Sequence, residues 1–372
     1  MKYKQLRSTR GGYIMIFTLL VIAISMVIVA YIGQRGSIHG PFMRTAIDRE
    51  KAKILALSGV QVAIAQLSQK TDQKEKKAEP QQKEEAGKSS ATQSNDAKNL
   101  LQTLLLVINR WQDFDLVESV DGVDGRISLC LMCEEGKINL NRVYNFKKEM
   151  FRGDKEKGWK TIMPELFKSI EKITKDSDGS LFTAFEKMCK ERRSKFNDAT
   201  EMITKKEFNY FKQLLFYEPL IVVSAEKKDK KPQTIYLTDI FTVWSSSGKI
   251  EPWLFSHSLQ TIFGFDSAAQ EGDAKKRKEM VDGWLKNFKQ KANWQQDWKT
   301  MLQPMYGKEL RTLPKNIDSM LSATCDPHFF SVRVHGKVGE VTQRLYAILE
   351  RTKRSGSADS VYDIAVKKLY WL

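Results

Sequence analysis

The chain has 372 residues, and its composition excludes both a wholly disordered protein and a small disulfide-stabilised one. Hydrophobic residues make up 41% of it, including eight Trp and nineteen Phe, which suffices for about two domains with their own cores. The net charge of +16 comes from 61 Lys and Arg spread among 45 Asp and Glu, without an arginine-rich block. We therefore expect a basic solvated surface and no nucleic-acid partner.

A short basic segment precedes a long uncharged one. Residues 1–12, MKYKQLRSTRGG, contain four Lys or Arg and no acid, and the twenty residues 13–32 carry no charge. Twenty uncharged, mainly apolar residues match the thickness of a bilayer and exceed the apolar part of a cleaved secretory signal. The sequence thus predicts one transmembrane helix with its N-terminus in the cytoplasm and the bulk of the chain translocated.

The helix is predicted to continue through residues 33–68 as an amphipathic extension. Gly40 and Pro41 should interrupt or kink it, because proline lacks the N–H that the helix needs. Beyond them, apolar residues recur at helical spacing on one face. This face could be an ordinary core face or one that packs against neighbouring subunits, and periodicity does not separate the two. Its members are Met43, Ile47, Ile54, Leu57 and Ile64.

Residues 69–98 contain no aromatic residue and no Leu, Ile or Val. Such a segment buries too little apolar surface to offset its ordering entropy, so it is predicted to be a disordered linker. Structure should resume near Leu100. Further on, Cys130 and Cys133 form a lone C-x-x-C in a predicted strand, where residues three apart face opposite sides. They are interpreted as buried thiols, and the pairing of the four cysteines, which include Cys189 and Cys325, is left open.

Three stretches after residue 132 carry patterns that are typical of strands and turns. Residues 133–143, CEEGKINLNRV, and residues 238–265, which include SSSGKIEPW, each place G-K-I after a predicted strand. Residues 329–351 alternate apolar and polar residues around Gly339, which indicates a hairpin. Between these stretches, 146–218 and 266–325 show helical spacing of apolar residues.

A basic leader that ends in glycine before an uncharged helix resembles the prepilin signal of type IV pilins and type II secretion pseudopilins. The resemblance implies cleavage between Gly12 and Tyr13 by prepilin peptidase and methylation of the new N-terminus. Most members of the family carry glutamate at the fifth mature position, which is Phe17 here. The K-type minor pseudopilins, which cap the pseudopilus, characteristically lack that glutamate. The three later stretches resemble the same class, although Cys133 replaces its usual first acid and Glu251 departs from its asparagine pattern.

The resemblance implies an α+β fold, with a pilin-like long N-terminal helix, an antiparallel sheet and an inserted, mostly α-helical domain. The expected organisation is a leader (1–12), a transmembrane helix (13–32), its amphipathic extension (33–68), a linker (69–98), the first part of the core (99–145), a helical insertion (146–218), core strands with the second G-K-I turn (219–265), a second helical segment (266–325) and C-terminal core strands (326–372).

The function implied is that of a structural tip subunit of the type II secretion pseudopilus, needed for assembly and length control. Its partners would be the I-type and J-type minor pseudopilins, the major pseudopilin and prepilin peptidase, with the anchor in the bacterial inner membrane and the head in the periplasm. The alternatives are a tip or minor subunit of a type IV or competence pilus, or an unrelated membrane-anchored periplasmic protein. Neighbouring genes would discriminate among them.

Catalysis is not expected. Ser256, His257 and Ser258 lie close in sequence, but no nucleophile elbow or orienting acid accompanies them. The D-x-D-G at residues 176–179 is half of a calcium loop at best and is interpreted as a turn. No cofactor is predicted, and calcium enters only through the resemblance.

Overall fold

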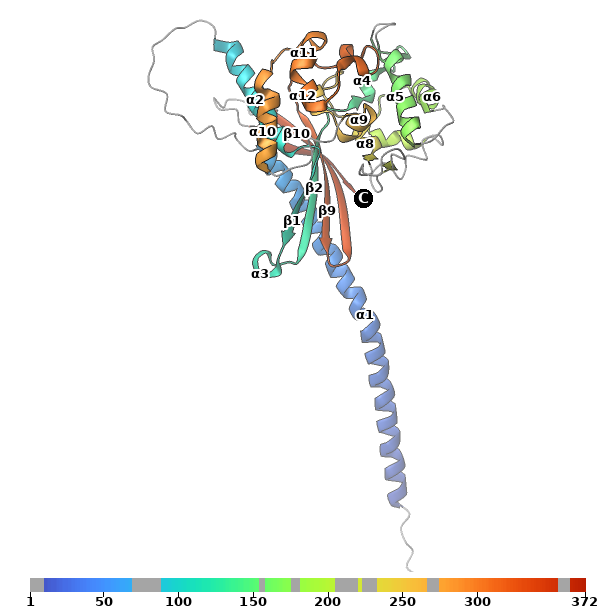
Figure 1. The fold of residues 1–372 in the computed structure, drawn as a ribbon. Coiled ribbons are helices and arrows are strands. Elements are labelled where there is room, and N and C mark those ends of the chain that lie inside the picture. Colours follow the sequence, from blue (N-terminus) through green and yellow to red (C-terminus); the bar gives the residue numbers. More distant parts are fainter. Residues whose placement is uncertain are drawn as a thin grey trace, which may run out of the picture.

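The structure is a computed structural model that describes residues 10–68, 88–153, 158–174, 181–204, 220–222, 233–265, 274–353 and 362–372. The side chains of residues 10–16, 32–41, 88–95, 174, 203–204, 220–222 and 233–234 lie outside that description. Helices and a mostly antiparallel sheet make an α+β fold, as predicted. A long helix extends from one end of a head that contains the other elements (Figure 1).

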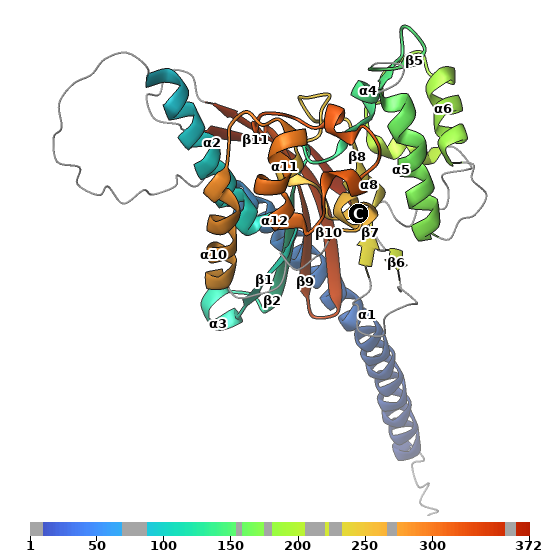
Figure 2. The ribbon, with the colours of Figure 1, turned by 45° about the horizontal axis from the view of Figure 1, so that its top comes forward.

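The first helix, α1, runs without a break over Arg10–Ser68. Of the two alternatives predicted at Gly40 and Pro41, an interruption or a kink, the interruption is therefore wrong. One proline removes a single backbone hydrogen bond, and the turns on either side remain hydrogen-bonded. The next helix, α2, spans Lys88–Val107 and lies beside α10, where the Gln102 amide donates to Asp282 Oδ1 at 2.5 Å. Figures 1 and 2 both place these two helices together at one side of the head.

The limits of α2 correct the predicted linker. Residues 88–98 are helical, although they lack Leu, Ile and Val, because they extend a helix whose apolar part begins at Leu100. Ala97, Leu101 and Leu104 are buried, so the packed part of α2 holds the preceding turns in register. Residues 69–87, the rest of the predicted linker, lie outside the described residues.

A five-stranded sheet forms the core, with the strand order β1-β2-β9-β10-β11 and antiparallel pairing throughout. The G-K-I pattern of residues 133–143 follows the second strand directly, and the predicted hairpin turns at Gly339, whose φ is +55°. The strands are β1 (Trp111–Leu116), β2 (Gly125–Cys133), β9 (Phe329–Val338), β10 (Val341–Lys353) and β11 (Tyr362–Trp371).

Short helices and strands of the head gather at one end of this sheet (Figure 2). The predicted helical insertion contributes α5 and α6, and the predicted second helical segment contributes α10 to α12. The elements before residue 236 are α3 (Glu118–Asp121), β3 (Ile138–Asn139), α4 (Leu140–Val143), β4 (Tyr144–Asn145), β5 (Met150–Phe151), α5 (Trp159–Thr174), α6 (Leu181–Glu191), η1 (Ala199–Thr204), β6 (Leu220–Val222) and β7 (Gln233–Ile235). Those after it are α8 (Leu237–Ile240), β8 (Phe241–Thr242), η3 (Pro252–Leu254), α9 (His257–Ile262), α10 (Ala274–Trp284), η5 (Leu285–Asn287), α11 (Trp294–Met301), α12 (Gln303–Tyr306), η6 (Leu310–Thr312) and η7 (Ile317–Met320).

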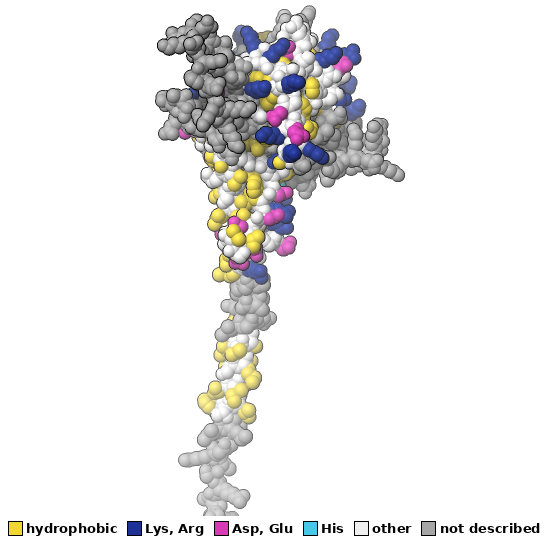
Figure 3. All heavy atoms as spheres, turned by 60° about the vertical axis from the view of Figure 1, so that its left-hand side comes forward, with side chains coloured by type: hydrophobic (Ala, Val, Ile, Leu, Met, Phe, Trp, Pro, Cys, Tyr) yellow, Lys and Arg dark blue, Asp and Glu magenta, His cyan; other side chains and the backbone are white. Residues whose placement is uncertain are grey.

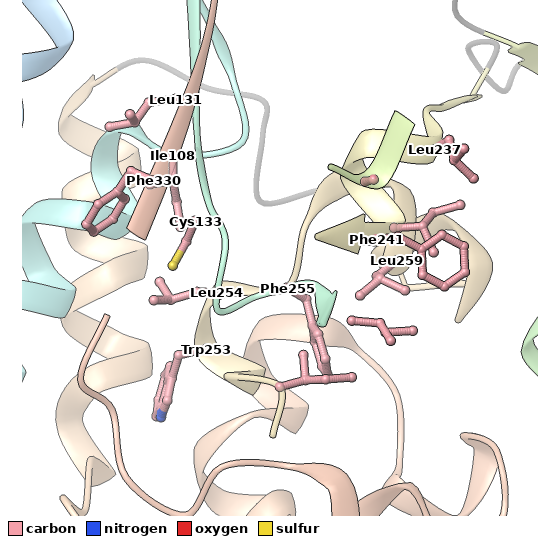
Figure 4. Close-up of a cluster of buried hydrophobic side chains, with 14 of the residues drawn as sticks. Ile108, Leu131, Cys133, Leu237, Phe241, Trp253, Leu254, Phe255, Leu259 and Phe330 are labelled. Atoms are coloured by element: carbon pink, nitrogen blue, oxygen red, sulfur yellow. The ribbon is translucent and has the colours of Figure 1, made fainter. Parts of the chain in front are cut away.

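One continuous hydrophobic core joins the sheet to these elements. Figure 4 shows the junction, where side chains from β2 and β9 meet those of η3, α8 and α9. Full burial of a large apolar side chain stabilises a fold by about 1.5–3 kcal/mol, so this junction holds the head firmly on the sheet. The labelled residues, all buried, are Ile108, Leu131, Cys133, Leu237, Phe241, Trp253, Leu254, Phe255, Leu259 and Phe330.

Candidate assembly surface

The inner face of α1 packs on the sheet through small residues. Ala52, Ala56 and Ala63 are completely buried, and Gly59 lies between them at the same helical spacing. A Cβ added at Gly59 would lie 2.3 Å from Val334 Cγ1, and one added at Gly336 of β9 would lie 2.3 Å from the carbonyl oxygen of Ala52. Small side chains are therefore what lets the backbone of the helix approach the sheet this closely.

The outer face of α1 carries the residues that the sequence pattern singled out. Met43, Ile47, Ile54 and Leu57 are 63%, 56%, 62% and 42% exposed, whereas Ile64 is partly buried against the core. Four of the five side chains are thus unavailable to the head's own core, and the ordinary core-helix interpretation does not hold for them. An exposed apolar stripe of this kind is typical of a surface that packs against another molecule.

Apolar side chains also surround the N-terminal half of α1. Between residues 17 and 31 they are exposed along the face of the helix that Figure 3 shows, and none packs against the head. Judged on the described residues alone, no helix is long and apolar enough to cross a membrane. The exposed large side chains are Phe17, Leu19, Leu20, Val21, Ile22, Ile24, Met26, Val27, Ile28, Val29 and Tyr31.

The predicted processing site lies at the start of α1. The helix begins at Arg10, so Gly12 and Tyr13 are in its first turn, and their side chains lie outside the described residues. Phe17 is 67% exposed, and it precedes the first residue of the stripe, Met43, by 26 residues along the same helix. The predicted residues therefore follow one another along a single helix and do not converge on a pocket.

The two G-K-I turns meet where the head joins the sheet. Gly136 of the first turn lies so close to the return of the second that an added Cβ would be 1.7 Å from the carbonyl oxygen of Leu254. The backbone N–H of Glu251 donates to the carbonyl of Glu135 at 2.8 Å, and that of Ser256 donates to Gly136 at 3.2 Å. The first turn also leads into β3, which pairs in parallel with β8. The recurrence of the pattern thus builds one joint.

Buried charged groups hold this joint. The Lys137 ammonium is fully buried, pairs with Glu134 and donates to Ser331 Oγ at 3.0 Å, while the Thr242 hydroxyl donates to Glu134. Burial alone would lower the pKa of Lys137, but Glu134, by its charge and its hydrogen bond, together with Tyr346 and Asp239 outweighs it, and the pKa is raised. Next to the pair, the Glu135 carboxylate accepts the backbone N–H groups of residues 328 and 329.

Glu251, where the sequence departs from the family's asparagine pattern, caps the short helix η3. Its carboxylate accepts the N–H of Trp253 at 3.4 Å. The side chain is almost completely buried, and burial raises its pKa well above the ordinary value for glutamate. It borders a polar cavity of about 190 Å³ that Glu135, Asp326 and His328 also line. His328 has its pKa raised to about 9, chiefly by its hydrogen bond to Asp326.

A second polar anchor fixes the head to the outer surface of the sheet. Arg333 of β9 donates to Asp239 Oδ1 of α8 at 2.8 Å and to the Thr238 hydroxyl at 3.1 Å. Its guanidinium also lies 3.9 Å from the ring centre of Tyr236. Both members of the ion pair are buried, so removing one would strand the other in a dry environment. The Ser258 hydroxyl donates to the same Asp239 carboxylate at 3.1 Å, which gives it a structural role.

All four cysteines are free and buried. Cys133 points into the main core, and Cys130 packs on the opposite face of the sheet with Met132, Tyr346 and Ile348, as predicted for residues three apart in a strand. Burial raises the pKa of Cys130 to about 12 and that of Cys133 well above its usual range. Thiols in this state are poor nucleophiles and metal ligands.

Within the described part of the chain, no three His, Cys, Asp or Glu side chains are grouped to hold a metal ion. The D-x-D-G at residues 176–179 lies outside that part. Ser256, which the sequence places beside His257, caps α9 by accepting the N–H of Leu259 and donates to the carbonyl of Asp239. Ser256 therefore has the role of a helix cap. Among the described residues, the apolar stripe on α1 is the strongest candidate for a functional surface.

No protein-family model matches the chain, and no curated protein matches its sequence. Among solved structures, it is similar to a chain of the GspK-GspI-GspJ complex from the type 2 secretion system of enterotoxigenic Escherichia coli. The sequence identity is 13%, the alignment covers 76% of this chain and 94% of that chain, and the TM-score is 0.37.

Proposed function

We propose that the chain is a minor pseudopilin, a structural subunit at the tip of a type II secretion pseudopilus. The observation that supports this most is the division of α1 into three surfaces. Its inner face is buried in the head, its outer face exposes Met43, Ile47, Ile54 and Leu57, and its segment 17–31 exposes apolar side chains without a charged one. A helix built in this way suits an anchor that continues into a subunit interface.

In this proposal residues 13–32 lie in the bacterial inner membrane, after prepilin peptidase cleaves behind Gly12 and the new N-terminus at Tyr13 is methylated. The head is periplasmic. The I-type and J-type minor pseudopilins and the major pseudopilin pack against the outer face of α1. The subunit acts by packing and by the bulk of its head, without catalysis and without a cofactor.

Processing is tested by mass spectrometry of the protein extracted from membranes. The mature chain should begin at methylated Tyr13. Gly12→Val should leave an intact Met1 terminus, because a bulky side chain before the scissile bond does not fit the narrow peptidase site that glycine can enter. Gly11→Val is the matched control and should still be cleaved. An unprocessed wild-type chain in cells with active prepilin peptidase would refute the proposal.

The interface is tested by Ile47→Asp and Leu57→Asp. Both side chains are exposed, so the head should fold normally, whereas a charge forced into an apolar interface costs several kcal/mol. Co-purification with the other minor pseudopilins should fall by at least a hundredfold, which corresponds to about 2.7 kcal/mol. Thr45→Asp, at an exposed position on the opposite side of α1, introduces the same charge outside the stripe and is the control. Unchanged co-purification of the first two variants would refute the assigned face.

The tip position rests on Phe17. A glutamate at this position in the family is thought to meet the N-terminal amine of the subunit ahead, and an apolar ring offers no such partner. Overproduction of the protein should therefore shorten filaments, and deletion should abolish them or disturb their length. Immunogold labelling that finds the subunit along the whole filament would contradict the tip assignment while leaving the interface on α1 intact.

A further inference from the structure

A groove of about 640 Å³ lies between α11 and α12 on one side and residues 309–318 on the other. This volume is within the range of about 300–1,000 Å³ that is usual for ligand sites. Trp298, Leu313 and Ile317 are buried and form its floor. Figure 1 places α11 and α12 at the end of the molecule opposite the free half of α1, so the groove is remote from the proposed assembly surface.

Hydrogen bonds hold the walls of the groove at a fixed spacing. The Trp298 indole N–H donates to the carbonyl of Lys308 at 2.9 Å, and the Gln295 amide of α11 donates to Asp318 Oδ2 at 2.9 Å. The ring of Trp298 also packs against Tyr306 of α12. Because both walls are tied to each other and to a buried floor, the groove exists before any ligand arrives, and a ligand would spend little free energy on ordering it.

The charges around the groove are unbalanced. Its two acidic groups are engaged, Glu309 with Arg311 and Asp318 with the Gln295 amide. Lys299 and Lys315 are exposed at the rim, and neither has a hydrogen bond or ion pair with another described residue. Two ammonium groups beside an apolar floor attract a ligand that combines a negative charge with an apolar group.

The remaining polar groups favour a peptide. Gln303 lines the groove, and its carboxamide presents a donor and an acceptor together, as a peptide backbone does. A phosphate group has no apolar part to fill the floor, and the arginine of this lining, Arg311, is already paired with Glu309. We propose that this groove binds an extended peptide segment in which an acidic residue stands next to apolar ones, an activity independent of assembly through α1.

The test uses the purified full chain and an acetylated, amidated peptide of sequence Gly-Leu-Glu-Leu-Gly, titrated by calorimetry at low ionic strength. Replacing Lys299 and Lys315 together by Gln should weaken binding about tenfold, since each exposed charge pair contributes up to about 1 kcal/mol. Lys286→Gln combined with Lys291→Gln is the matched control, because both lysines are exposed outside the groove lining. All four lysines are exposed, so every variant should keep its thermal midpoint.

A second arm distinguishes the chemistry of the ligand. Gly-Leu-Lys-Leu-Gly should bind at least tenfold more weakly than the glutamate peptide, and Leu310→Ser should weaken both. Equal affinity for the two peptides, or equal losses in the groove variant and the control variant, would overturn the proposal in favour of unspecific attraction to a basic protein. Absence of binding at millimolar peptide would overturn it as well. So would phosphatidylglycerol vesicles that bind wild type but not the groove variant, since the site would then be one for lipid.

Discussion

Replacing Gly336 by alanine should dislodge α1 from the sheet. The added methyl group would lie 2.3 Å from the carbonyl oxygen of Ala52, 2.7 Å from the backbone nitrogen of Ala56 and 3.1 Å from Leu55 Cβ. Two of these atoms belong to the helix backbone and cannot rotate away, so the whole helix must shift. Overpacking of a dense core costs about 1–3 kcal/mol, and the contacts with backbone place this variant near 3 kcal/mol.

The assay is thermal and urea unfolding of the purified protein. A loss of about 3 kcal/mol should lower the midpoint of thermal unfolding by roughly 6–12 °C in a domain of about 200 residues. Gly283→Ala in α10 is the control of opposite sign. Its Cβ would meet nothing within 4 Å, and alanine in a helix is favoured over glycine by about 0.5–1 kcal/mol. If Gly336→Ala unfolds within about 0.5 kcal/mol of wild type while the control is stabilised, the close seating of α1 is wrong.

Three further predictions concern the joint and its anchors. Because burial raises the pKa of Glu251, the folded protein binds more protons than the unfolded chain, so stability should fall as pH rises above about 4.5, and Glu251→Gln should flatten that slope in urea unfolding between pH 5 and pH 8. Arg333→Met or Asp239→Asn alone should each cost about 3–5 kcal/mol, because a buried charge is left unpaired, whereas the double variant should recover part of the loss in a double-mutant cycle; strict additivity would contradict the coupling. Gly136→Ala should reduce soluble expression far more than Gly248→Ala, whose added Cβ finds only ordinary contact with Arg142 at 3.4 Å, and similar yields of the two proteins would show that the turns do not meet as described.

The regular elements of the chain were predictable because the periodicity of apolar residues and the turn residues indicate them. Alternation over residues 329–338 and the glycine at 339 specify the β9–β10 hairpin without reference to other parts of the chain. The limits of α2 were not predictable in the same way. Composition reports how much apolar surface a segment can bury, but it does not show that residues 88–98 continue a helix that is packed further along.

The two faces of α1 illustrate what the apolar pattern could and could not show. Isoleucine and leucine at helical spacing predicted that Ile47, Ile54 and Leu57 share one face of α1, and that face is exposed. The side that packs on the sheet carries the small residues Ala52, Ala56, Gly59 and Ala63. Hydrophobicity scales rank alanine and glycine below leucine and isoleucine, so the pattern of large apolar residues did not identify this side. Their spacing of four residues with Gly59 nearby was the available signal, since small residues at that spacing permit close backbone approach. The groove beside α11 had no signal in the sequence, because its walls come from segments that only the fold brings together.

The seat of α1 also limits how the molecule can respond to a pull along its axis. Sliding the helix by one turn, about 5.4 Å, would bring each inner-face position to the place of the residue four positions away. Ala63 would then have to occupy the site of Gly59, and so would Leu55 for a slide in the opposite direction, although a Cβ at that site would lie 2.3 Å from Val334 Cγ1. The helix therefore fits the sheet in a single axial register. Tension or thrust applied to residues 17–31 should therefore be transmitted along the continuous helix to β9, against which α1 is packed.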